Sequence, residues 1–116
     1  MVKLSSKVKT LINSTVNYLS RYYKIEQVIL FGSHTVGTLH RYSDIDLAVI
    51  SHDFAKKNLD DLLNIFSKVS LRLSPDIEIH PFTPEDISEA RPTNFIGYII
   101  KNGIVVYTNS SKKRKN

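Results

Sequence analysis

Two aspartates lie one residue apart in a stretch that otherwise predicts a buried strand. They are Asp44 and Asp46, within the apolar run at residues 44–50. Side chains alternate along a strand, so both carboxylates point to the same face, where they repel each other. A divalent cation removes that repulsion, and carboxylate oxygens suit Mg²⁺ or Mn²⁺. Two other interpretations stay open: a proton shared by the pair, and a strand end at which both acids are solvated or cap a helix.

A third carboxylate comes from a later stretch, residues 77–81, that also predicts a strand. Glu78 lies there between two isoleucines, so its side chain points away from theirs. If the two strands are neighbours, Glu78 completes a three-carboxylate site with Asp44 and Asp46. Sites of this kind hold two metal ions, which activate an attacking oxygen and stabilise a leaving one.

Two other polar residues share the predicted strand face of Glu78. Asp76 is a competing third ligand, although its place directly after Pro75 is more typical of a turn or a cap. His80 precedes Pro81 at the predicted end of the strand. We therefore interpret His80 as a loop residue rather than as a metal ligand.

A glycine and a serine precede the aspartates. Gly32 follows an apolar strand predicted at 25–31, and a glycine there lets the backbone approach a ligand closely. Ser33 then begins a short helical turn whose N–H groups attract phosphate. The alternative is a plain strand-to-helix turn that Ser33 caps.

The sequence also predicts the elements that must position these residues. Apolar residues at helical spacing indicate amphipathic helices, and short β-branched runs indicate strands. The expected elements are helix 5–23, strand 25–31, a short helical turn and loop at 33–43, strand 44–50, helix 59–73, strand 77–81, a short helix from 84, helix 94–101 and strand 104–107. Their alternation predicts an α/β fold (α+β by some schemes), with a small mixed sheet flanked by helices.

Length and composition set outer bounds. The 116 residues fit one domain, and 41% apolar with 23% charged residues is ordinary for a globular protein. No apolar run approaches the ~18 residues of a membrane span, and the first ten residues lack the apolar core of a signal peptide. We therefore expect a cytoplasmic protein. The absence of cysteine excludes disulfides, thiolate zinc sites and a cysteine nucleophile.

The net charge of +5 is concentrated at the C-terminus. Lys112, Lys113, Arg114 and Lys115 carry four of these charges, which leaves +1 for residues 1–111. We expect a domain over 1–108 and a basic, disordered tail over 109–116. Nucleic acid binding through the tail is an alternative that the nearly neutral domain does not favour.

Taken together, the motif residues resemble the G-S-x10-D-x-D signature of the minimal nucleotidyltransferases, in the DNA-polymerase-beta-like superfamily. Ten residues separate Ser33 from Asp44, as the signature requires, and Gly37 matches a second glycine of the family. The linked motif is fairly specific, unlike a D-x-D pair alone.

The resemblance covers roughly residues 5–108. Glu78 and the Thr83-Pro84-Glu85 run resemble the strand with the third carboxylate and the helix after it. The closing NGIVVY is similar to the family's last strand. One departure is that His34 and Val36 stand where family members often carry arginines.

The resemblance implies the nucleotidyltransferase fold and the transfer of a nucleoside monophosphate, AMP above all, from ATP or another nucleoside triphosphate. Asp44 and Asp46 would hold two Mg²⁺ ions, with Mn²⁺ as the alternative. Glu78 would help to hold the ion beside the acceptor hydroxyl. Ser33 and the backbone near Gly32 would bind the β and γ phosphates. Catalysis then rests on positioning and charge neutralisation.

The resemblance also implies a partner. Minimal nucleotidyltransferases are commonly paired with a helical HEPN protein, as antitoxin to toxin, and some transfer AMP to a tyrosine of that partner. We predict a protein adenylyltransferase of this kind. One alternative is a stand-alone transferase for a small molecule or an RNA end, working as a homodimer. Another is a non-catalytic module that binds a nucleotide or a partner. The tyrosines suggested for a homodimer interface are Tyr22, Tyr23, Tyr42 and Tyr98.

Overall fold

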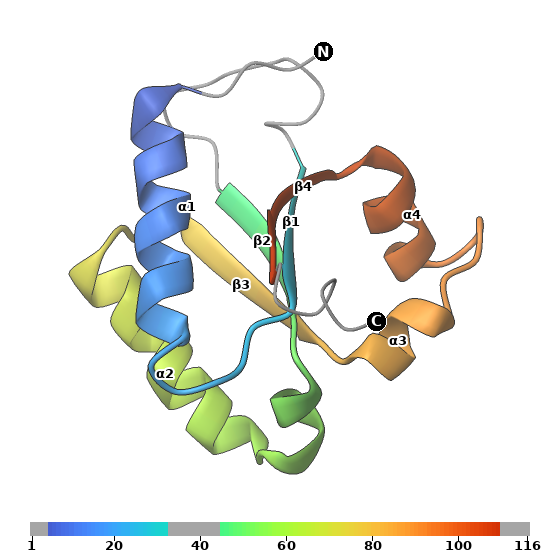
Figure 1. Cartoon of the computed structure of the whole chain (residues 1–116), viewed down its shortest axis with the longest axis horizontal. Coiled ribbons are helices and arrows are strands. Elements are labelled where there is room, and N and C mark those ends of the chain that lie inside the picture. Colours follow the sequence, from blue (N-terminus) through green and yellow to red (C-terminus); the bar gives the residue numbers. More distant parts are fainter. Residues whose placement is uncertain (1–4, 33–44, 110–116) are drawn as a thin grey trace.

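The structure, a computed structural model, describes residues 5–32 and 45–109 (Figure 1). The turn and loop expected at 33–43 and the tail beyond 109 lie outside these ranges. The described elements, in chain order, are α1 (Ser6–Leu19), β1 (Gln27–Phe31), β2 (Ile45–Ile50), the 3-10 helix η2 (His52–Lys56), α2 (Leu59–Arg72), β3 (Ile77–Phe82), α3 (Pro84–Ser88), α4 (Phe95–Asn102) and β4 (Ile104–Thr108). None of the described helices has the length and apolar character that a membrane crossing requires.

The strands of the described residues form one sheet in the order β3-β2-β1-β4. β1 pairs antiparallel with both β2 and β4, whereas β2 and β3 run parallel. A parallel pair needs a long crossover, and η2 and α2 supply it. This mixed sheet with flanking helices confirms the predicted fold class.

Side-chain alternation along the strands assigns the two faces of the sheet. On one face, Leu47 and Val49 of β2 pack with the apolar sides of α1 and α2. On the other, Ala48 and Ile50 pack with Ile99 of α4 and with residues of α3. Helices therefore cover both faces, as Figure 1 shows. Asp46 shares the second face with Ala48, so the predicted chemistry lies on the side of α3 and α4.

Caps fix the start of the two helices on this side. Thr83 and Asp86 form a reciprocal capping box ahead of α3: the Asp86 N–H donates to Thr83 Oγ1 at 3.1 Å, and the Thr83 N–H donates to Asp86 Oδ2 at 2.9 Å. Pro84 occupies the first turn, where no N–H is needed. Asn94 Oδ1 accepts from the Gly97 N–H at 2.8 Å and caps α4. The predicted helix start at Thr83-Pro84 is confirmed.

Two leucines of α2 give a matched test of the core. Leu62 is 5% exposed and belongs to the buried cluster beneath the sheet, whereas Leu71 is 84% exposed. We expect Leu62→Ala to lower the free energy of unfolding by about 2–4 kcal/mol, because it leaves a cavity. Leu71→Ala should change it by less than about 0.5 kcal/mol. Urea unfolding followed by circular dichroism measures both, and equal losses would show that α2 does not pack as described.

Candidate active site on strands β2 and β3

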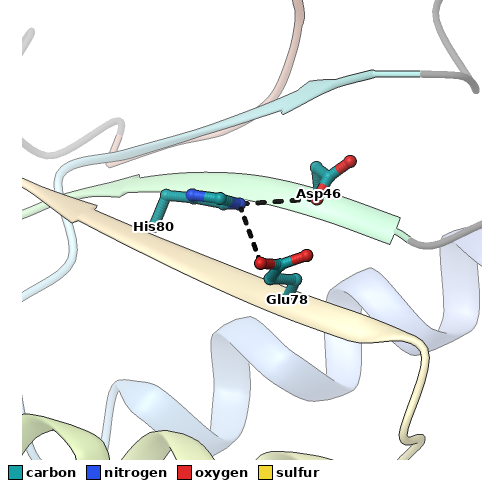
Figure 2. Close-up of side chains that lie close together, drawn as sticks. All are labelled: Asp46, Glu78 and His80. Atoms are coloured by element: carbon teal, nitrogen blue, oxygen red, sulfur yellow. Dashed lines mark hydrogen bonds and ion pairs between the residues drawn. The ribbon is translucent and has the colours of Figure 1, made fainter.

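The register of the two parallel strands brings three polar side chains together. Asp46 of β2 lies opposite Glu78 of β3, and Ala48 lies opposite His80. Register partners on parallel strands point to the same face, and residues two apart on one strand do so as well. Figure 2 shows the result: Asp46, Glu78 and His80 converge in front of the sheet. One ligand atom from each of the three lies within 4.8 Å of the other two.

The imidazole of His80 lies between the two carboxylates. Its Nε2 is 3.4 Å from Asp46 Oδ1 and 3.9 Å from Glu78 Oε2. The ring also packs edge-on against Phe31, with ring centroids 5.0 Å apart, and lies 6.3 Å from Phe95 at the start of α4. These aromatic contacts hold the plane of the imidazole and direct Nε2 toward the acids.

The interpretation of His80 as a loop residue is wrong. β3 continues through Pro81 to Phe82, so His80 is a strand residue on the face of Glu78. The reason is that β3 is an edge strand. The carbonyls of Asp76 and Phe82 accept hydrogen bonds from the N–H groups of Ile45 and Ser51, so even-numbered residues of β3 bond toward β2. Pro81 is odd-numbered and faces the open edge, where no N–H is needed. The alternation of Glu78 and His80 was the signal that identified this face from sequence.

Gly32 closes the site from the end of β1. Its φ is +93°, in the left-handed region that L residues with a side chain rarely adopt. A Cβ at this position would lie 2.6 Å from Asp46 Oδ2. Only a glycine therefore lets the backbone come this close to the carboxylate. The structure thus places the Gly32 backbone beside Asp46, and the predicted approach of this backbone to a ligand stays a prediction.

The other predicted site residues divide into two groups. Ser33 and Asp44 lie outside the described residues. Asp76 lies in the turn before β3, where its N–H donates to Ser74 Oγ at 3.1 Å. It takes no part in the cluster that joins Asp46 to Glu78.

The donor set fits a divalent cation. Two carboxylates and an imidazole are common ligands of such ions. Atoms bound to one ion at about 2.1 Å lie about 3–4 Å apart, which is the range of the contacts that His80 makes with Asp46 and Glu78. Among the described residues, Asp46, Glu78 and His80 are the group of histidine and acidic side chains close enough to share one metal ion.

Comparison with known proteins identifies the family. The model of the family described as polymerase beta nucleotidyltransferase matches residues 13–112. The protein adenylyltransferase MntA of Shewanella oneidensis is 36% identical to this chain over 58 residues, or 48% of the chain. The matched segment spans 39% of the length of that relative.

Solved structures share the fold. A crystal structure of a candidate nucleotidyltransferase from Sulfolobus solfataricus matches 95% of this chain and 94% of its own, with a TM-score of 0.65 and 16% identity. A toxin–antitoxin with AMP-PNP matches with a TM-score of 0.59 and 22% identity, over 90% of this chain and 76% of its own. A tri-AMPylated HEPN toxin in complex with MNT antitoxin, from Shewanella oneidensis, matches with a TM-score of 0.54 and 16% identity, over 91% and 76%.

These likenesses to solved structures agree with the fold that the motif predicted, and the family model extends over most of the chain. The resemblance found from the Gly32-Ser33 and Asp44-Ile45-Asp46 motif is thereby confirmed at the level of family. The chain belongs to the polymerase beta nucleotidyltransferase family.

Proposed function

We propose that this nucleotidyltransferase moves AMP from ATP to a hydroxyl of a partner protein, and that the partner is a HEPN-type toxin for which the chain is the antitoxin. The observation that carries the proposal is the pairing of Asp46 with Glu78 on parallel strands, beside Gly32, in a chain of this family. Two likenesses support the choice of acceptor. One is to the protein adenylyltransferase MntA, and the other is to an MNT antitoxin in complex with an AMPylated HEPN toxin.

The residues take the following roles in this proposal. Asp46 and Glu78, together with Asp44, hold two Mg²⁺ ions. When bound, these ions lower the pKa of the acceptor hydroxyl and neutralise charge on the phosphates. Ser33 and the backbone at Gly32 bind the β and γ phosphates, which directs the α-phosphorus of ATP toward the carboxylates.

The transfer itself is an in-line displacement. The acceptor oxygen attacks the α-phosphorus, the bond between the α-phosphorus and the α,β-bridging oxygen breaks, pyrophosphate leaves with that oxygen, and the hydroxyl proton is lost to solvent. Glu78 stands on the edge strand with its side chain 58% exposed, whereas that of Asp46 is 22% exposed. The acceptor therefore approaches from the side of Glu78, and the triphosphate lies toward Asp46 and Gly32.

Of the four tyrosines suggested for a homodimer interface, the structure describes three, and one of these is buried. Tyr23 is buried against Phe54, with ring centroids 5.1 Å apart, so it cannot line an interface. Tyr22 and Tyr98 are exposed, and Tyr42 lies outside the described residues. The homodimer and the cytoplasmic location both stay predictions.

The position of a radioactive label tests the proposed reaction. The chain is incubated with Mg²⁺, ATP and a HEPN-type protein that it binds. Adenylyl transfer labels the partner from [α-³²P]ATP and not from [γ-³²P]ATP. Label from the γ position would indicate phosphoryl transfer instead, and absence of label from both positions would contradict a protein acceptor.

A further inference from the structure

We propose that His80 is itself a metal ligand, and that its imidazole shifts this site from Mg²⁺ toward a first-row transition-metal ion such as Mn²⁺. The inference rests on the metal site of the proposed function and adds a nitrogen ligand to its carboxylates. Its basis is the position of Nε2, which faces Asp46 and Glu78 at the same time (Figure 2).

The distances among the three side chains are compatible with coordination of one ion. An N–H···O hydrogen bond is usually 2.7–3.2 Å long, and a separation near 3.9 Å is not one. His80 Nε2 stands 3.4 Å from Asp46 Oδ1, a long hydrogen bond, and 3.9 Å from Glu78 Oε2, beyond hydrogen-bond range. Two atoms bound to one octahedral ion at about 2.1 Å are about 3.0 Å apart when they are adjacent, and up to about 4.2 Å apart at wider angles. The contacts of His80 with Asp46 and Glu78 thus fall within the range expected of ligands of one ion.

The position of His80 is built into the fold. Its backbone lies in β3 opposite Ala48, whose small side chain leaves room above β2. The ring packs edge-on against Phe31, which is itself buried and packs against Phe95 at 5.6 Å. The imidazole is therefore held in place before any ligand binds, which lowers the entropy lost on coordination.

A nitrogen donor changes which ion the site prefers. Mg²⁺ binds oxygen ligands and gives up its waters reluctantly. Imidazole suits first-row transition-metal ions, and a site of mixed nitrogen and oxygen donors favours them. With His80 included, two carboxylate groups and one imidazole meet at the site, so removal of the imidazole should weaken transition-metal binding more than Mg²⁺ binding.

The chain offers a stringent control in His52. This histidine also lies beside two carboxylates, with Nε2 3.3 Å from Glu26 Oε2 and Nδ1 4.0 Å from Glu85 Oε2. Its two nitrogens face different acids, and it belongs to no three-ligand group among the residues that the structure describes. If a position beside two carboxylates were enough, removal of His52 and removal of His80 would weaken metal binding equally. If His80 coordinates the ion, only its removal should do so.

Electron paramagnetic resonance of bound Mn²⁺ provides the test, using the full chain without nucleotide. Wild type should show electron spin-echo modulation from a directly bound ¹⁴N nucleus. His80→Ala should lose it and weaken Mn²⁺ binding about 10-fold, while Mg²⁺ binding, measured by competition, changes less than about 3-fold. His52→Ala should behave as wild type. Persistence of the ¹⁴N signal in His80→Ala, or equal weakening for both ions, would overturn the proposal.

Two further arms keep the outcome decisive. His80→Gln preserves side-chain bulk, so loss of the ¹⁴N signal in a folded Gln variant excludes unfolding as the cause if the Ala variant does not fold. Nucleotide transfer is assayed separately on the same samples. Mn²⁺ bound through His80 without transfer would defeat the proposed function and leave this inference intact, and transfer without the ¹⁴N signal would do the reverse.

Discussion

Asp46→Asn is expected to lower the rate of AMP transfer by about 10³-fold or more while leaving the fold intact. The substitution keeps the shape of the side chain and removes its charge. In the proposed mechanism this carboxylate helps to hold the metal ions and faces both Glu78 and the Gly32 backbone. Loss of a single electrostatic group aimed at the reacting atoms typically lowers catalytic rates by about 10²–10³-fold, and loss of a metal ligand adds weaker metal binding.

Asp60→Asn is the matched control for this result. Asp60 lies in the exposed first turn of α2, far along the chain from the cluster, and its loss should change transfer less than about 2-fold. Thermal unfolding checks that both variants fold. Because Asp46 and Glu78 are close and carry like charge, Asp46→Asn should not lower the melting temperature. Retention of more than about a tenth of the wild-type rate would contradict the role assigned to Asp46.

Gly32→Ala is expected to lower the rate of AMP transfer by about 10²-fold. Most of this loss should come from displacement of Asp46 and not from unfolding of the protein. The new Cβ would stand 2.6 Å from Asp46 Oδ2, so the carboxylate has to turn away from its present position. A displacement of about 1 Å in a catalytic group can reduce the rate by about 10²-fold. The positive φ of +93° adds backbone strain of about 1–2 kcal/mol.

Two readouts separate these effects at Gly32. Urea unfolding measures the strain, and the transfer rate at saturating ATP measures the displacement of Asp46. A loss of stability with an unchanged rate would show that the carboxylate keeps its catalytic position despite the added Cβ. The conclusion that a Cβ at position 32 displaces the Asp46 carboxylate would then be wrong.

Local sequence patterns predicted most of the framework. The helical periodicity of residues 59–73 and the capping signals at Thr83-Pro84 correspond to α2 and α3, because each depends on residues close together in the chain. The alternation in β2 correctly separated the face of Asp46 from that of Leu47. These features are encoded locally, so a single sequence is enough to predict them.

Local sequence patterns could not predict which strands pair with each other. The sequence allowed Glu78 to join Asp46 only if their strands were neighbours, and the register that places them opposite each other depends on the crossover through α2. Nothing local showed that β1 would lie between β2 and β4. His80 was misinterpreted for the same reason. A proline usually ends a strand, and β3 continues through Pro81 because it lies at the edge of the sheet.

Part of the candidate site stays a prediction. Asp44 and Ser33 complete the motif in sequence, and both belong to the segment outside the described residues. Asp46, Glu78 and Gly32 are brought together by the fold. A metal titration of Asp44→Asn beside Asp46→Asn would show whether the two aspartates serve the same ions.

The intact mass of the HEPN-type partner after incubation with the chain, Mg²⁺ and ATP tests the central claim most directly. Wild type should add one or more units of AMP to the partner, with release of one pyrophosphate for each. Asp46→Asn should leave the mass of the partner unchanged over the same period, and Asp60→Asn should match wild type. An unmodified partner with wild-type protein, or equal modification by wild type and Asp46→Asn, would contradict the account.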